Sequence, residues 1–289
     1  MQAEATISAA KLREHRARTF CYLPRKRLRS KQDAIDFVNE RGAVFFWPIK
    51  GFDFPSLWGA VAGDRPVPNN HDDPAHVTWG WKDDLLGKKV WFYAKILRQK
   101  STIISLDLLP YFYALSPNYG NPEEDYLISY EEGVLSSEEK LVYEALLNNG
   151  ALDSLMLRKA ANLSSSENTS RFNRALLLLQ RDFRILPVGI AESGAWHYAF
   201  VFDAVHRQFP DLTDRAHDIS EAQARQEILR SYFLSVGSAT KNDVKKLFQW
   251  IDLSIDRSLK TLVGNGFLIE GVQIKDKPGD WFTIIKLLD

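Results

Sequence analysis

An internal repeat occupies the second half of this chain. Residues 143–163 and 230–250 overlay without a gap, so that Gly150 matches Gly237 and Lys159 matches Lys246. Each stretch joins two helical patterns through its glycine, and a second amphipathic helix and two short β-rich runs follow. This order of helix, turn, helix, helix and hairpin is that of a winged helix. The repeat therefore predicts two tandem winged helices, a fold that binds nucleic acid or protein.

Capping patterns indicate where the helices of the repeat begin. Ser136 and Glu139 have the spacing of a capping box ahead of the opening helix of the first copy, and Ser164 and Glu167 have it ahead of the second amphipathic helix. Asp252 is the expected N-cap of the corresponding helix in the second copy. These signals agree with the apolar periodicity, so the helices are expected at these places.

The β-rich runs predict the hairpin, or wing, of each copy. In the first copy the runs cover residues 184–188 and 196–202, and in the second copy they cover residues 267–272 and 281–287. In the second wing, Pro278 with Gly279 is the expected turn.

The predicted fold class is α+β, with tandem winged-helix (helix-turn-helix) domains around a β-structured centre. The expected segments are a basic N-terminal arm with a winged-helix-like domain (1–72), an aromatic-rich middle segment (73–134), a winged-helix domain (135–212) and a C-terminal winged-helix domain (216–289).

Composition excludes several classes of protein. The single cysteine, Cys21, rules out an intramolecular disulfide framework and a zinc site of several thiolates. The chain has no phosphate-binding loop, dinucleotide fingerprint, nucleophile elbow or paired-histidine zinc motif. His71, Asp73 and His76 lie in a loop of turn-forming residues, for which turn chemistry is a sufficient reason, and no metal or cofactor is expected. No apolar run is long enough for a membrane span. We expect a cytoplasmic monomer, associated with the nucleoid if it binds DNA.

The charge of the chain is unevenly distributed. There are 37 basic and 37 acidic side chains, but residues 1–31 hold nine of the basic ones and only two acidic ones. Such an arm suits contact with phosphates, although a solvated helix followed by a basic loop would have the same composition. The candidate phosphate ligands in the arm are Arg25, Lys26, Arg27 and Arg29.

The two copies of the repeat differ in their recognition-helix candidates. The helix of the first copy presents Asn168, Arg171 and Arg174, which can donate to phosphates or base edges. The helix of the second copy begins with Asp252 and Asp256, which would repel phosphate. We therefore expect nucleic-acid contact from the first copy, with unpartnered surface side chains as the alternative.

The second copy is expected to be structural, or to touch a nucleic acid only through its wing. Lys275 and Lys277 are the candidate residues there.

The middle of the chain is rich in tryptophan, with five of the eight between residues 47 and 91. Trp79 and Trp81 are candidates for stacking on a base, and the adjoining Lys82, Asp83 and Asp84 are candidates for acid–base catalysis. The alternatives are that the rings fill a core and that the two aspartates decorate a helix N-terminus.

Several features together resemble the AlkZ/YcaQ family of DNA glycosylases. They are the basic N-terminal helix, a helix that ends at residues 40–42 (ERG), a β-rich run, residues 55–58 (PSLW) and the turn at residues 236–240 (VGSAT). The resemblance implies tandem winged helices that clasp duplex DNA. It also implies metal-free excision of N7-alkylated purines or unhooking of crosslinks.

The catalytic motif of that family is absent from this chain. The family has Gln-x-Gln or Gln-x-Asp after the glycine, and Phe45 and Trp47 occupy those two positions here. An acceptor for water must then come from elsewhere, with Asp83 or Asp84 as candidates, or the activity is lost or changed. The other functions that we consider are a winged-helix regulator or repair accessory without catalysis, and a protein-interaction module, which the mildly acidic body favours.

Overall fold

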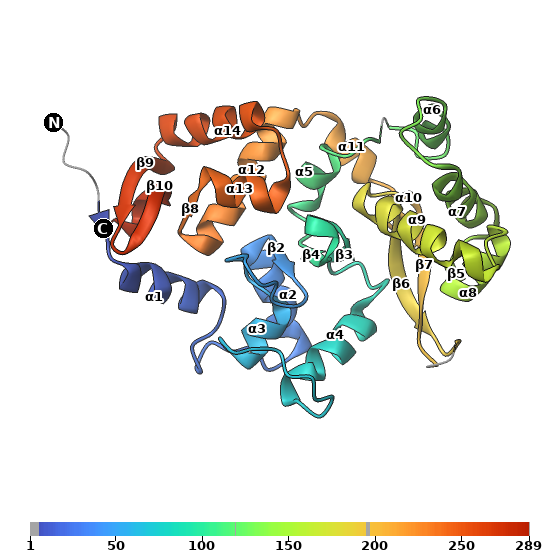
Figure 1. The fold of residues 1–289 in the computed structure, drawn as a ribbon, viewed down its shortest axis with the longest axis horizontal. Helices are drawn as coiled ribbons and strands as arrows, with labels where there is room; N and C mark the ends of the chain where they lie inside the picture. Colours follow the sequence, from blue (N-terminus) through green and yellow to red (C-terminus); the bar gives the residue numbers. More distant parts are fainter. Residues whose placement is uncertain (1–5, 119, 195–196, 289) are drawn as a thin grey trace.

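The fold is a mixed α+β arrangement of three similar units (Figure 1). The computed structural model describes residues 6–118, 120–194 and 197–288. None of the helices in these ranges is long and apolar enough to cross a membrane.

The middle of the chain forms two of the units. The first unit consists of α2 (Lys31–Arg41), β2 (Ala43–Phe45), α3 (Leu57–Ala62), α4 (Val77–Leu85), β3 (Phe92–Lys95) and β4 (Ser101–Ile104). The second unit consists of α7 (Ser137–Asn149), β5 (Leu152–Asp153), α8 (Ser154–Ala160), α9 (Thr169–Arg181), β6 (Ile185–Ala191) and β7 (Ala199–Ala204).

The third unit completes the series. It consists of α12 (Glu221–Val236), β8 (Ser238–Thr240), α13 (Lys241–Phe248), α14 (Asp252–Gly264), β9 (Leu268–Ile274) and β10 (Lys277–Ile284). The elements outside the units are β1 (Thr6–Ile7), α1 (Ala9–Thr19), α5 (Leu109–Tyr113), α6 (Asp125–Glu131), α10 (Val205–Gln208) and α11 (Leu212–His217). Four short 3-10 turns also occur, at Pro74–His76 (η1), Leu97–Gln99 (η2), Ser166–Asn168 (η3) and Ile285–Leu287 (η4).

All three units have the same element order and the same sheet topology. Each has helix, strand, helix, helix and hairpin, and the lone strand pairs antiparallel with the second strand of the hairpin. The sheets therefore have the orders β2-β4-β3, β5-β7-β6 and β8-β10-β9, with β1 added in parallel beside β9. The sequence repeat revealed only the last two units. The expected boundary at residue 72 is wrong, because it falls inside the first unit, whose sheet joins residues 43–45 to residues 92–104.

A glycine follows the opening helix of every unit. Gly42, Gly150 and Gly237 each cap the helix with a positive φ, of 73°, 79° and 77°. This conformation turns the chain from the helix into the short strand, and it favours glycine because a Cβ would be strained there.

Helix starts follow the expected caps only in part. Ser136 and Glu139 form the capping box that the sequence predicts. The box at Ser164 is not formed, since α9 begins only at Thr169 after the 3-10 turn η3. In this segment the guanidinium group of Arg158 donates to the carbonyl oxygen of Ser165 at 2.5 Å and to the hydroxyl of Thr169 at 2.8 Å.

Two expectations for the third unit are also corrected. Asp252 is the first residue of α14 and not its cap, and its carboxylate pairs with Lys245 at 3.0 Å. Pro278 and Gly279 lie within β10, and the turn is formed by Lys275 with Asp276, whose φ is 65°. In the first predicted wing, Trp196 lies outside the described residues.

The central sheet of the first unit separates two hydrophobic cores. Alternate residues of its strands face opposite sides, as the two-residue period of a strand requires. Phe45 and Ile104 belong to the core shared with the third unit, whereas Val44 and Ile103 belong to the core beneath the helices of the first unit. The sheet is thus buried on both faces, which fixes the position of the residues that follow β2.

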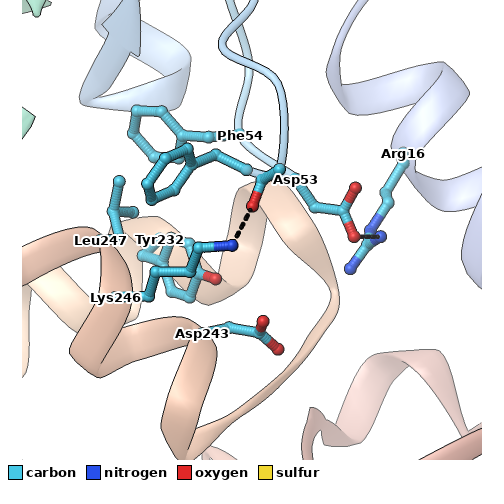
Figure 2. Close-up of a pocket in the computed structure, with 9 residues that line it drawn as sticks. Arg16, Asp53, Phe54, Tyr232, Asp243, Lys246 and Leu247 are labelled. Carbon is cyan, nitrogen blue, oxygen red and sulfur yellow. Dashed lines mark hydrogen bonds and ion pairs between the residues drawn. The ribbon is translucent and has the colours of Figure 1, made fainter.

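Side chains of α1 and of the third unit contact the loop of the first unit that contains Gly51 and Asp53 (Figure 2). Lys246 of α13 donates to the carbonyl oxygen of Gly51 at 2.9 Å. Arg16 of α1 pairs with Asp53 and donates to the carbonyl oxygen of Ser238 at 2.9 Å. The enclosed pocket has a volume of about 10 Å³, which is the size of a single water molecule. These charged residues therefore hold the units together and leave no space for a ligand.

Candidate active-site cavity

A cavity of about 530 Å³ lies between the first and second units. This volume is in the range of small-molecule and base-binding pockets. Most of its wall comes from α4 and the central sheet of the first unit, and the rest comes from β7 and the residue before it. The lining residues are Phe46, Trp47, Trp79, Lys82, Asp83, Tyr93, Lys95, Ser101, Tyr198 and Phe200.

Lys82 is enclosed by aromatic rings at the cavity wall. Its side chain is only 2% exposed, and its Nζ lies 4.6 Å from the ring centre of Phe200. Burial lowers the pKa of Lys82, and the nearby Asp83 carboxylate partly offsets this effect. The Nζ forms an ion pair with Asp83 at 2.6 Å and donates to the hydroxyl of Tyr198 at 2.8 Å. A buried cation of this kind is stable because these groups replace its water.

Asp83 provides a carboxylate on the polar side of the cavity wall. Its Oδ1 accepts hydrogen bonds from Lys82 and, at 2.9 Å, from the hydroxyl of Tyr198. Its side chain is 26% exposed, and within the described ranges its Oδ2 has no hydrogen-bond partner. Two donors thus fix one carboxylate oxygen and leave the other able to accept a proton or stabilise positive charge.

The adjacent Asp84 does not reach the cavity. Its carboxylate pairs with Lys31, the first residue of α2, at 2.6 Å. Both aspartates lie in the last turn of α4, so the alternative interpretation of a decorated helix N-terminus is wrong. Carboxylates are unfavourable at the negative end of a helix dipole, and each of the two is compensated by its own lysine.

The two tryptophans proposed for stacking have different environments. Trp79 is 42% exposed, lines the cavity and packs edge-on against Trp47 with 5.8 Å between ring centres. Trp81 is only 8% exposed and belongs to the core of the first unit, so its proposed stacking role is wrong. Residues two apart on a helix point to different sides, which separates these neighbours.

The sequence does not predict Tyr198 or Lys95 as part of the cavity. Tyr198 is 116 residues from Lys82 along the chain, and no motif connects them. Lys95 is an isolated lysine in β3, and its Nζ donates to the hydroxyl of Ser101 at 2.9 Å. Tyr93 donates to the same hydroxyl at 3.1 Å, and burial raises the pKa of Tyr93 to about 12. A single lysine or tyrosine gives no sequence signal of its own.

Comparison with known proteins identifies the family. The model of the family described as AlkZ related matches residues 28–249, which is most of the chain. The chain belongs to the AlkZ-related family. The resemblance to the AlkZ/YcaQ group is thereby confirmed. Among solved structures, the DNA glycosylase AlkZ of Streptomyces sahachiroi is similar, with a TM-score of 0.57 and 12% identity over 97% of this chain and 71% of that one. No match was found among curated proteins.

The two positions of the family motif lie in different environments in this AlkZ-related chain. Phe45 is completely buried in the core shared with the third unit, in edge contact with Phe52 and Phe54. Trp47 lines the cavity next to Phe46. One motif position therefore faces the cavity of this AlkZ-related protein, and it carries an aromatic ring that cannot accept a proton.

The basic loop between α1 and α2 lies against α3, since the backbone N–H of Leu28 donates to the carbonyl oxygen of Ala60 at 3.1 Å. Directly after the loop, Lys31 of α2 pairs with Asp84 in the last turn of α4. The four candidate phosphate ligands in the loop are all exposed, and they are Arg25, Lys26, Arg27 and Arg29.

The other candidate nucleic-acid contacts lie elsewhere. Within α9, Arg171 is exposed and pairs with Glu138 at 3.5 Å, Arg174 is exposed, and Asn168 precedes the helix without capping it. In the third unit, Lys275 is exposed, whereas Lys277 lies 5.7 Å from the ring centre of Trp281. Figure 1 shows α9 and the β9–β10 hairpin at opposite sides of the molecule, so the AlkZ-related fold presents these candidates as separate patches.

Proposed function

We propose that this protein is a DNA glycosylase that accepts an everted base in the cavity beside Asp83. The observation that carries the proposal is the Oδ2 of Asp83, which has no hydrogen-bond partner among the described residues, in a cavity lined by aromatic rings. Membership of the AlkZ-related family supports the reaction class, since the similar solved structure is named a DNA glycosylase. The exposed ring of Trp79 would stack on the base, and the nearly perpendicular ring of Trp47 would contact its edge.

In the proposed reaction, water attacks C1′ of the deoxyribose and the bond from C1′ to the base nitrogen breaks. Positive charge develops on the sugar as the base leaves with the bonding electrons. The Asp83 Oδ2 stabilises this charge and accepts the proton that the water loses. Lys82 and Tyr198 hold the other oxygen, so that the carboxylate is oriented before the substrate binds.

Double-stranded DNA is the proposed partner, and the chain is proposed to act on it as a monomer. The basic loop (Arg25, Lys26, Arg27 and Arg29) directly precedes Lys31, which pairs with Asp84 next to Asp83, and it would contact phosphates that flank the everted nucleotide. The first turns of α9 and the wing of the third unit are the further proposed contacts.

Release of free base from duplex DNA containing N7-methylguanine tests the proposed reaction. Replacing Asp83 by Asn should lower base release by about 10²–10³-fold, because the amide has no negative charge. Duplex affinity should change little. The matched control is Asp84→Asn, which alters the neighbouring carboxylate outside the cavity and should retain activity. Equal release by wild type and the Asp83 variant would refute the role of Asp83.

A DNA-binding protein without catalysis is the second candidate function. It is favoured by the aromatic residues at both positions of the family motif, Phe45 and Trp47. Salt-sensitive binding to duplex DNA without release of any of a panel of alkylated bases would support this candidate and exclude the glycosylase.

A further inference from the structure

Two lysines line the cavity, but only one has a carboxylate partner. Lys82 is paired with Asp83 and enclosed by rings. Lys95 is half-buried, and its Nζ donates to the hydroxyl of Ser101; within the described part of the chain no carboxylate lies at ion-pair distance from it. The glycosylase reaction proposed above makes no use of this amine.

The backbone holds Lys95 firmly in place. It is the last residue of β3, and β3 pairs with β4 so that Lys95 lies opposite Ser101. The backbone N–H of Lys95 donates to the side-chain carbonyl of Gln180 in α9 at 3.2 Å. Its side chain is therefore presented to the cavity from a fixed strand, as a reacting group requires.

We propose that Lys95 is a nucleophile that forms an imine with the C1′ aldehyde of an abasic deoxyribose in DNA. This inference rests on the proposed function, because release of a base leaves such a sugar. The activity goes beyond hydrolysis of the glycosidic bond, since it attaches the protein covalently to DNA and leads to cleavage of the strand.

The chemistry balances without an added oxidant or reductant. The neutral amine adds to the carbonyl carbon, a C–N bond forms, and the carbonyl oxygen leaves as water with two protons, one of them from the solvent. The resulting iminium draws electrons from the sugar, so that C2′ loses a proton and the C3′–O bond breaks. The departing group is the downstream strand with its 5′-phosphate. Asp83 Oδ2 lines the same cavity and is the nearby group suited to accept the C2′ proton.

The surroundings of Lys95 favour the neutral amine that this step needs. Burial is the largest effect that lowers the pKa of Lys95, and the positive charges of Lys100 and Lys82 lower it further. A desolvated lysine next to another cation is a recognised form of activated amine. The hydroxyl of Ser101 accepts one N–H and so orients the group.

Lys82 is unsuited to the same role. Its Nζ is ion-paired and faces aromatic rings, and its side chain is almost completely inaccessible. For Lys82 to attack the sugar, its ion pair with Asp83 would have to break and α4 would have to move.

The test is borohydride trapping on DNA that already contains an abasic site. The full chain is incubated with a duplex bearing one such site, and sodium borohydride reduces any imine to a stable amine. We expect a covalent complex on a denaturing gel, with the adduct mapped to Lys95 by peptide mass analysis. Lys95→Gln and Lys95→Arg should both lose it, whereas the exposed Lys88→Gln should retain it. Thermal unfolding and binding to a tetrahydrofuran abasic analogue verify that the variants are folded.

The outcomes separate this inference from the glycosylase proposal. Because the abasic site is supplied, trapping is expected even if the protein releases no base from alkylated DNA. Base release by a wild-type protein that cannot be trapped would overturn the role of Lys95 alone. Undiminished trapping by Lys95→Gln, or an adduct at another residue, would also overturn it.

Discussion

At the scale of single residues, the cavity combines an ion pair with an amine, that of Lys95, which has no carboxylate partner in the described part of the chain. Lys82 and Asp83 neutralise each other, which leaves Lys95 as the group whose charge state decides the electrostatics of the site. A low dielectric makes such a charge costly, so its proton dissociates more readily than in water.

The pH dependence of the rate of imine trapping should reveal the titration of the Lys95 amine. Below the pKa of Lys95 the amine is protonated and cannot attack, so the rate should rise with pH and then level off. The plateau should be reached below about pH 10.4, the usual pKa of lysine, because burial lowers the pKa. Lys100→Gln should shift the profile to higher pH, since it removes a nearby positive charge. The measurement is the single-turnover rate of trapping with cyanoborohydride; a midpoint at the usual lysine value would contradict the prediction.

Tyr198→Phe should weaken excision without unfolding the protein. The variant removes the hydroxyl that connects Lys82 and Asp83, but it preserves the ion pair between them. One hydrogen bond to a charged group contributes about 1.5–3 kcal/mol, so base release should fall by roughly 10- to 100-fold. Thermal unfolding measured by circular dichroism should change little, because Tyr198 is 43% exposed. A large loss of stability with unchanged excision would mean that the hydroxyl is only structural.

The sequence predicts only the part of the cavity that is contiguous along the chain. A ring, a cation and an anion adjoin in one short segment, and this pattern predicts Trp79, Lys82 and Asp83. The same pattern includes Asp84 and Trp81, but the rotation of the helix turns them away from the cavity. Tyr198 comes from a distant hairpin, and only the folded chain brings it to this site.

At the scale of elements, the sequence of the first unit does not reveal that its fold is the same as that of the other two units. In the second and third units the lone strand passes directly into the next helix, so β5 ends at Asp153 and α8 begins at Ser154. In the first unit, residues 46–56 separate β2 from α3. This insertion prevents a gap-free overlay, although the glycine, the strand order and the hairpin are all retained.

Alanine at the three capping glycines should destabilise the protein to different degrees. At Gly150 an added Cβ meets no atom within 4 Å, so only the backbone strain of positive φ applies, about 1–2 kcal/mol. At Gly42 and Gly237 a Cβ would also collide with Ser231 and with His15, respectively. We expect these two variants to lose more free energy of unfolding than Gly150→Ala in urea titrations; equal losses would show that packing at these sites is unimportant.

At the scale of the whole molecule, positive charge is concentrated at one place on a chain of zero net charge. The four basic residues of the loop are all exposed, whereas Arg16 and Lys246 use their charges for internal contacts. The location of the basic side chains, and not the net charge of the chain, therefore determines which surface would bind a polyanion such as DNA.

Replacing Arg25, Lys26, Arg27 and Arg29 by Ala should weaken duplex binding and flatten its salt dependence. For every phosphate that the variant no longer neutralises, the slope of log affinity against log salt should become shallower by about 0.9. Fluorescence anisotropy at several salt concentrations measures this slope, with Lys275→Ala/Lys277→Ala as the comparison at the other patch. An unchanged slope would exclude the loop from the interface. If the wild type shows no salt-dependent binding, a protein-interaction module becomes the better description.

The pairing of β1 with β9 has a consequence for solubility. β9 is seven residues long, and β1 lies in parallel beside its last two residues, Gln273 and Ile274, which would be unpaired on that side without it. Open strand edges invite pairing with another molecule and promote aggregation. A chain shortened to begin at α1 would expose this edge, and it should associate with itself in light-scattering measurements while its helices remain folded. We therefore expect the first strand to limit self-association of the protein, although it contributes only two residues to the sheet.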